Sequence, residues 1–315
     1  MLSGEKHTAY FLTIMAGISI GAIPVISAIM RDNNFFTLEQ MMLRLLFGAL
    51  FSSIILIYFF VRKNEFHSWF NRNLQFGYFV QGMVLVLQFY VYLGAIVIGT
   101  PAGEVALLVQ IHPIVTLLIG WLFLHELITK EKSLAVFIAI IGIIILAQPW
   151  TWNNVLSHWI GDLLALFNGI LYGFYIILGR KFHTIRKSIP SSISISWVLI
   201  WSFINGIILT IFVNIFPLSE SFKLFRLERI MTIEGIVFGI IFSLLGSVIP
   251  YSLIMYSTKS IESSKASILL LGEAISAMIL AYIFLNEQIT INYVIGGIIL
   301  FFAIIIIVDP LKRYN

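Results

Sequence analysis

The sequence predicts an all-α polytopic membrane protein with ten transmembrane helices, arranged as two inverted five-helix repeats. The first observation is composition: 60% of the 315 residues are hydrophobic and only 11% are charged, with a mean hydropathy of +1.01. A soluble domain is usually about a quarter charged. The second observation is that apolar segments of spanning length recur along the chain, and the third is that some of them resemble one another. A soluble globular fold is therefore excluded.

Ten apolar segments approach the roughly 20 residues that a helix needs to cross a bilayer. We expect these spans near 8–30, 38–61, 74–96, 101–124, 133–149, 160–179, 193–216, 234–257, 265–285 and 290–308. The connections are too short for a soluble domain. The first residues, MLSGEKHTAYFL, lack the apolar core and cleavage site of a signal peptide, so we expect the first span to be retained.

Lys and Arg residues concentrate in the loops on the side of the N-terminus, which predicts both termini in the cytoplasm and a place in the cell inner (cytoplasmic) membrane. The net charge of +4 reflects this bias, so we expect no nucleic-acid partner. Trp150, Trp152 and Trp159 then lie at the outer interface, and Ser219–Ile233 is predicted to form a short interfacial helix. Because the chain has no cysteine, disulfides and thiolate metal sites are excluded. We expect no metal and no cofactor.

The stretch Pro101–Glu126 has a second copy at Lys265–Glu287. In this alignment His112 falls on Glu273. The segment GISIG of the first span also resembles GILYG of the sixth. Five spans in each half require the second half to be inserted upside down, and we place the repeats at residues 1–150 and 151–315. Inverted repeats are typical of secondary transporters, whose substrate site lies near the bilayer midplane between the repeats.

These features resemble an EamA-type member of the drug/metabolite transporter superfamily, over nearly the whole chain. The segments and the residue that carry the resemblance are Pro113–Gly142, Gly161–Arg180, Gly272–Ala303 and Arg44. Ala274 departs from the family, which often has proline there. The resemblance implies a cavity formed mainly by spans 1, 3, 4, 6, 8 and 9. It also implies alternating-access transport of a small metabolite (an amino acid, an amine or an amphiphilic compound), with export favoured over uptake.

Three of these spans carry polar side chains along one helical face, as the helical repeat allows. The polar residues are Gln81, Gln88 and Tyr92 in the third span, Asn168, Tyr172 and Tyr175 in the sixth, and Ser243, Ser247 and Tyr251 in the eighth. They either line a substrate cavity or bond neighbouring helices to each other. Tyrosine rings would suit a substrate with an aromatic or cationic part.

Five ionisable residues lie within or beside the spans. His112 and Glu273 fall near the midplane, where they either bind a substrate amine, couple transport to protons, or form a structural hydrogen bond between the halves. Glu104 and Lys265 lie about 12 Å to opposite sides of the midplane, at the two mouths of the pathway. Arg44 is expected near a mouth too, and we favour a side chain that snorkels outward over one that binds substrate.

Three further acidic residues receive structural interpretations. Glu126 and Glu287 end their helices at the membrane interface, and we expect them to mark the fold rather than bind substrate. Asp162 opens the sixth span, where the helix dipole favours a negative charge.

Two other classes of function remain as alternatives. A membrane-embedded enzyme would need a nucleophile–base set or a metal cluster, and the sequence has no HExxH, no Gly-x-Ser-x-Gly and no Walker A motif. A scaffold or receptor is disfavoured by the short loops. We therefore expect no enzymatic activity, and partners limited to a small-molecule substrate, the lipid bilayer and, as an open option, protons. The sequence leaves monomer and homodimer open.

Overall fold

The computed structural model describes residues 2–63, 72–147, 155–185, 189–287 and 291–308, and every regular element in them is helical. Eight helical segments are long and apolar enough to cross a membrane. They are Lys6–Asp32, Thr37–Val61, Arg72–Val97, Ala102–Leu124, His158–Phe182, Ser191–Val213, Ile233–Ser257 and Ser263–Leu285. The shorter apolar helix Val294–Val308 follows them. The chain is therefore a multi-pass membrane protein, as its composition predicts.

The expected number of ten spans is not reached within the described ranges. The fifth and tenth expected spans correspond to α8 (Lys130–Ala147) and α17 (Ile291–Val308). The apolar part of α8 is shortened by the charged run Lys130–Lys132 in its first turn. Part of each expected span, 148–149 and 290, lies outside the described residues.

Several spans are interrupted helices rather than continuous ones. The chain runs through α1 (Leu2–Ile20), α2 (Ala22–Asp32), α3 (Thr37–Lys63), α5 (Arg72–Val97), α6 (Ala102–Leu108), the 3₁₀ turn η1 (Val109–Ile111), α7 (His112–Leu124) and α8. It continues through α9 (Val155–Ile185), α10 (Ser191–Val213), α11 (Glu220–Lys223), α12 (Leu227–Ile230), α13 (Ile233–Ser243), the π-helical turn η3 (Leu244–Val248), α14 (Ile249–Ser257), α15 (Ser263–Leu269), α16 (Gly272–Leu285) and α17.

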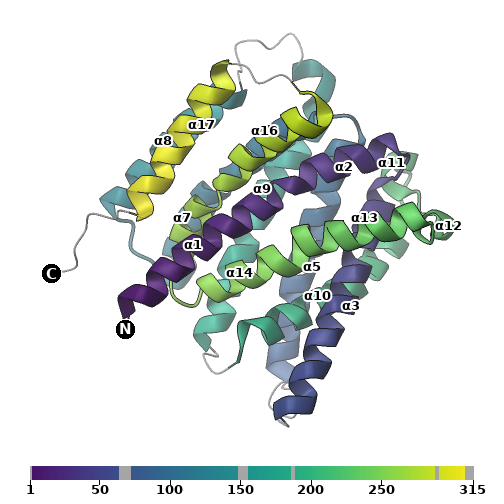
Figure 1. Ribbon diagram of the computed structural model, residues 1–315, viewed down its shortest axis with the longest axis horizontal. Coiled ribbons are helices and arrows are strands. Elements are labelled where there is room, and N and C mark those ends of the chain that lie inside the picture. The colour runs from purple at the N-terminus through teal and green to yellow at the C-terminus, as the bar shows by residue number, and fades with distance from the viewer. Residues whose placement is uncertain (1, 64–71, 148–154, 186–188, 288–290, 309–315) are drawn as a thin grey trace.

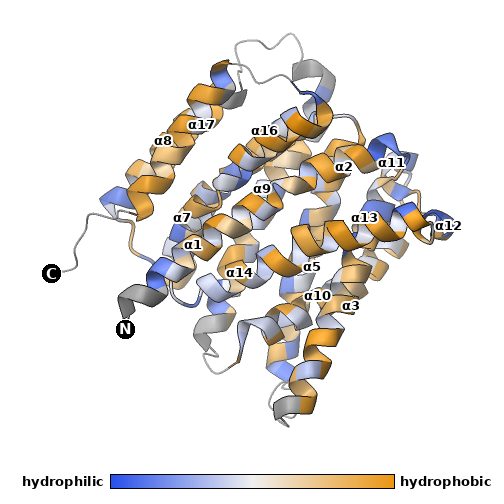
Figure 2. Cartoon of the chain, in the orientation of Figure 1, coloured by the Kyte–Doolittle hydropathy of each residue, from blue (hydrophilic) through white to orange (hydrophobic). Residues whose placement is uncertain are grey.

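The helices form one bundle in which α8 and α17 pack together at one side and α3 and α10 lie at the other (Figure 1). Between them, α1 packs against both α14 and α16, and α5 packs against α9. Apolar residues dominate the long helices, and polar residues gather mainly near helix ends (Figure 2). The start of α1 and the end of α17 lie at the same end of the bundle, which we call the terminal end; the other is the far end (Figure 1).

The two similar stretches adopt the same interrupted conformation. In the first, α6 ends at Leu108 and α7 begins at His112; in the second, α15 ends at Leu269 and α16 begins at Gly272. Both stretches end in a left-handed residue that is not glycine, namely His125 with φ 54° and Asn286 with φ 55°. Each span therefore breaks in its middle and turns sharply at its end.

The repeated glycines allow helices to approach closely. A Cβ atom on Gly21 would lie 1.9 Å from the hydroxyl oxygen of Ser276 and 2.7 Å from the carbonyl oxygen of Glu273. A Cβ atom on Gly169 would lie 2.6 Å from the carbonyl oxygen of Val109. The α1–α2 junction thus touches the backbone of α16, and α9 touches η1, as small residues allow in membrane proteins.

Gly21→Ala is expected to destabilise the protein by about 1–3 kcal/mol, because the added methyl group has no space and adjacent backbone must shift. The measurement is thermal unfolding of the purified protein in detergent. Gly297→Ala is the matched control, since the nearest atom to its Cβ is the flexible end of Met278 at 3.8 Å. Equal melting temperatures for the two variants would contradict this account of the α1–α16 contact.

The segment Ser219–Ile233 is not one helix, contrary to expectation. Its short helices α11 and α12 are separated by extended residues, including Leu224 and Arg226. The backbone N–H of Arg226 donates to the carboxylate of the fully buried Glu39 at 3.0 Å, and its Nε donates to the same oxygen at 2.7 Å. These bonds hold Arg226 in the extended conformation. Of the tryptophans expected at the interface, Trp159 is 54% exposed, and the other two lie outside the described residues.

Candidate functional site

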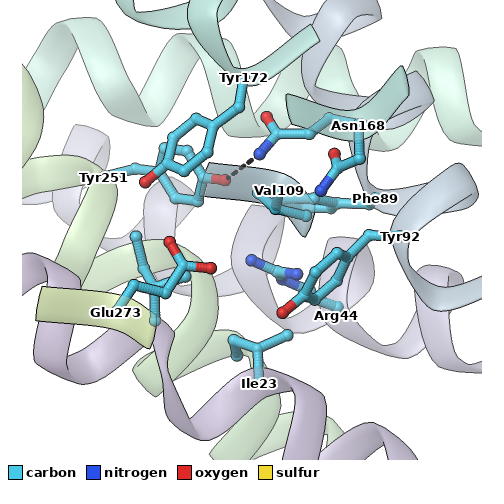
Figure 3. A pocket seen from close by; sticks show the side chains of 11 residues that line it. Ile23, Arg44, Phe89, Tyr92, Val109, Asn168, Tyr172, Tyr251 and Glu273 are labelled. Carbon is cyan, nitrogen blue, oxygen red and sulfur yellow. Dashed lines mark hydrogen bonds between the residues drawn. The ribbon is translucent and has the colours of Figure 1, made fainter. Parts of the chain in front are cut away.

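A small cavity with charged and polar walls lies between the interrupted helices. Its lining comes from α1, α2, α3, α5, η1, α9, α14 and α16, and comprises Ile20, Ile23, Arg44, Gln88, Phe89, Tyr92, Val109, Asn168, Tyr172, Tyr251 and Glu273. Figure 3 shows their side chains pointing toward one space. The volume of about 10 Å³ is roughly what one water molecule requires. In this conformation the cavity is therefore contracted around its polar groups.

Arg44 forms one wall of the cavity and is only 2% exposed. Its Nε donates to the hydroxyl of Ser247 at 2.8 Å, and a terminal nitrogen donates to the carbonyl oxygen of Gly246. Both acceptors belong to η3, where π-helical geometry replaces the regular α-helical bonding. The guanidinium also stacks over Phe89, 3.5 Å from the ring centroid. These contacts fix a buried positive charge beside the cavity.

This position of Arg44 differs from the expected one near a pathway mouth. The side chain lies inside the bundle, because its hydrogen-bond acceptors are Ser247 and Gly246 of η3. A buried guanidinium needs such acceptors to offset the loss of water. Arg44, which is among the residues that carry the family resemblance, thus lies beside the central cavity rather than near one end of the bundle.

Glu273 faces the same cavity from the first turn of α16, directly after the break in that span. It is 1% exposed, and its Oε2 has no hydrogen-bond partner. Figure 3 shows its carboxylate and the Arg44 guanidinium turned toward one space from opposite sides. Among the described residues, the two groups form no ion pair within 4.0 Å. The cavity therefore separates a carboxyl group from a guanidinium group.

Other polar atoms around the cavity also lack partners. They are Oε1 of Gln88, the hydroxyl of Tyr92, Oδ1 of Asn168 and the hydroxyl of Tyr172. One bond links two lining residues, from Nε2 of Gln88 to the Tyr251 hydroxyl at 3.2 Å. Since buried polar atoms are normally hydrogen-bonded, such a cluster is suited to a polar ligand or to water.

Four predicted site residues lie behind the lining rather than in it. Nδ1 of His112 is 2.5 Å from the hydroxyl of Ser267, and its ring centroid is 4.6 Å from that of Tyr172. Tyr175 packs edge-on against Tyr251, with 4.9 Å between ring centroids. Gln81 is buried, with neither side-chain polar atom bonded, and Ser247 holds Arg44. His112 thus contacts the cavity lining through Tyr172, and within the described residues no hydrogen bond joins it to Glu273.

The remaining predicted pair lies at the two ends of the bundle. Glu104 is in the first turn of α6, at the far end, beside Asp162 of α9. Lys265 is in the first turn of α15, at the terminal end, where its Nζ is 3.6 Å from a carboxylate oxygen of Glu262. Neither residue lines the central cavity.

An all-helical, multi-pass membrane protein with buried ionisable side chains around a central cavity has the architecture of a membrane transporter. Comparison with known proteins gives the family. The chain matches the EamA-like transporter family over residues 7–148 and 159–309, and it belongs to that family.

One relative, an "Uncharacterized transporter" of Archaeoglobus fulgidus, is 23% identical over 231 residues, which cover 73% of this chain and 76% of the relative. A solved crystal structure has the same fold with a TM-score of 0.69, over 98% of this chain and 99% of its own, at 10% sequence identity. The resemblance to EamA-type transporters is thus confirmed, and it argues against an enzyme.

Proposed function

We propose that this protein is a secondary transporter that binds a small metabolite between Arg44 and Glu273 and moves it across the cytoplasmic membrane by alternating access. The best-fitting substrate carries both an ammonium and a carboxylate group, as amino acids do. A simple amine or an amphiphilic compound with a charged group is the broader class. We expect export rather than uptake, as the family resemblance implies.

The observation that carries the proposal is a buried guanidinium group and a buried carboxyl group that face one cavity without pairing with each other. Burying an ion costs several kcal/mol unless it is paired, and such groups within membrane spans generally serve function. A substrate carboxylate would accept hydrogen bonds from Arg44, and a substrate ammonium would donate to Glu273. The rings of Tyr92 and Tyr172 add surfaces that attract a cation.

The small size of the cavity supports a site whose lining helices move apart to admit substrate. A volume of about 10 Å³ does not admit a metabolite, so the lining helices must separate before substrate binds. The two proposed repeats, residues 1–150 and 151–315, would provide this movement by tilting against each other. The breaks in the interrupted spans α6–α7 and α15–α16 would lie at the centre of this movement.

The test is flux in proteoliposomes that contain the purified protein. Three labelled compounds with one side chain form the panel: an amino acid, the amine left after removal of its carboxylate, and the acid left after removal of its amino group. We expect the amino acid to be transported fastest, because it alone contacts both charges. Flux no faster than in protein-free liposomes for all three compounds, together with no rise in melting temperature, would contradict the proposal.

A further inference from the structure

Glu126 binds the end of one interrupted span to the start of the other, at the terminal end of the bundle. The left-handed residue His125 turns the chain, and the N–H of Glu126 donates to the carbonyl of Gly120 at 3.1 Å. Its carboxylate accepts from the N–H and hydroxyl of Ser263 at 2.7 and 2.6 Å, and from those of Ser264 at 3.2 and 2.7 Å. We call these four bonds the Glu126 contact.

An ion pair reinforces the Glu126 contact. Lys132, fully buried in the first turn of α8, places its Nζ 3.0 Å from a carboxylate oxygen of Glu262, the residue before α15. The same Nζ donates to the carbonyl of Leu127 at 2.7 Å. The chain between α7 and α8 is thereby attached to the start of α15 at two neighbouring points.

Glu287 occupies the corresponding position at the far end. The left-handed residue Asn286 precedes it, and the N–H of Glu287 donates to the carbonyl of Ala281 at 3.3 Å. Its carboxylate accepts from the backbone N–H groups of Ala102 and Gly103 at the start of α6. Ala102 and Gly103 align with Ser263 and Ser264 in the two similar stretches, but have no hydroxyl groups to add. We call these two bonds the Glu287 contact.

The two contacts differ in strength and in surroundings. Burial raises the pKa of Glu126, but the bonds from Ser263 and Ser264 outweigh it and hold that pKa below its ordinary value. Burial also raises the pKa of Glu287, and there the bonds from Gly103 and Ala102 do not compensate. A cavity of about 340 Å³, lined by Glu287 and residues of α2, α6 and α16, opens beside the Glu287 contact. The far end is therefore the more loosely closed.

We propose that the Glu126 contact and the Glu287 contact are the two gates of the transporter, and that the stronger Glu126 gate makes the resting protein closed at the terminal end. Opening at that end separates α7 from α15 and breaks four bonds to a carboxylate. Opening at the far end separates α16 from α6 and breaks the two bonds of the Glu287 contact. This inference rests on the alternating access of the proposed function.

The test is the accessibility of a single cysteine, which is simple because the chain has none of its own. Thr116→Cys places a thiol on α7, one turn before Gly120, at a fully buried position. A water-soluble maleimide should label it slowly in the otherwise unchanged protein. Glu126→Gln should raise the labelling rate about tenfold or more, because charged hydrogen bonds that hold the closed state are lost.

Glu287→Gln is the matched control, since it makes the same chemical change in the other gate. It should leave labelling of Cys at position 116 unchanged or slower. Ser263→Ala with Ser264→Ala removes two donors from the opposite side of the Glu126 contact and should act like Glu126→Gln, so the result does not depend on one variant's folding. Unchanged labelling in both Glu126-contact variants, or equal acceleration by Glu287→Gln, would overturn the inference. Labelling needs no transported substrate, so a failure of the flux test alone would refute only the proposed function.

Discussion

Arg44→Ala is expected to lower transport of the amino acid at least about 100-fold. The substitution removes the group that would bind the substrate carboxylate, and truncating one partner of a buried, hydrogen-bonded charge pair in a complex typically costs about 2–5 kcal/mol. Flux of the three-compound panel in proteoliposomes is the measurement. The amine that lacks a carboxylate should lose less than the amino acid, because it has no group for Arg44 to bind.

Two further variants make the Arg44 result interpretable. Arg44→Lys keeps the buried positive charge but loses the planar guanidinium, so it should fold normally and bind the carboxylate more weakly. Arg72→Ala makes the same change as Arg44→Ala at an exposed residue in the first turn of α5, and should transport like the unmodified protein. Unchanged amino-acid flux in Arg44→Ala would rule out the proposed role of Arg44.

The spans and the polar lining follow closely from local sequence patterns. Gln88 and Tyr92 are separated by one helical turn, as are Asn168 and Tyr172, so each pair shares a helical face in any helix. The expectation that they converge on one cavity comes from the family resemblance, which implies a cavity formed mainly by spans 1, 3, 4, 6, 8 and 9. The assignment of Glu273 to the centre followed from its distance along an apolar span. The shared helical faces and the central position of Glu273 need only helix geometry.

The position of Arg44 could not be predicted in this way. Its acceptors lie in η3, about 200 residues away in the sequence, and no local pattern marks the π-helical turn there. The break between α11 and α12 has a similar cause, because Glu39, a buried residue of α3, fixes the conformation of Arg226. Where a distant partner decides a conformation, local propensity is a weak guide.

The roles of Glu126 and Glu287 could be predicted from the sequence only in part. Their places at helix ends were predicted, together with a structural role. Only the fold shows that each carboxylate reaches the start of the other similar stretch, and that Ser263 and Ser264 make one contact stronger. Ser263 and Ser264 have hydroxyl groups that Ala102 and Gly103 lack, and this difference makes the contact at the terminal end stronger than the contact at the far end.

Glu273→Gln should show the complementary pattern of substrate loss. Glutamine has nearly the shape of glutamate but no negative charge, so the ammonium group loses a charge-assisted bond, worth about 1.5–3 kcal/mol. Transport of the amino acid and the amine should fall at least about tenfold, whereas the acid without an amino group should be spared. The measurement is again flux of the three compounds, with and without a pH gradient.

The pH gradient distinguishes two roles for Glu273, amine binding and proton transfer. If Glu273 only binds the amine, Glu273→Gln lowers flux of the amine-bearing compounds and leaves their response to the gradient intact. If Glu273 carries the proton, the variant loses that response for every compound in the panel, including the acid. Glu220→Gln, at an exposed residue of α11, is the matched control. Unchanged amino-acid flux together with an unchanged response to the gradient would reduce Glu273 to a structural group, and the cavity would then have to select its substrate through Arg44 alone.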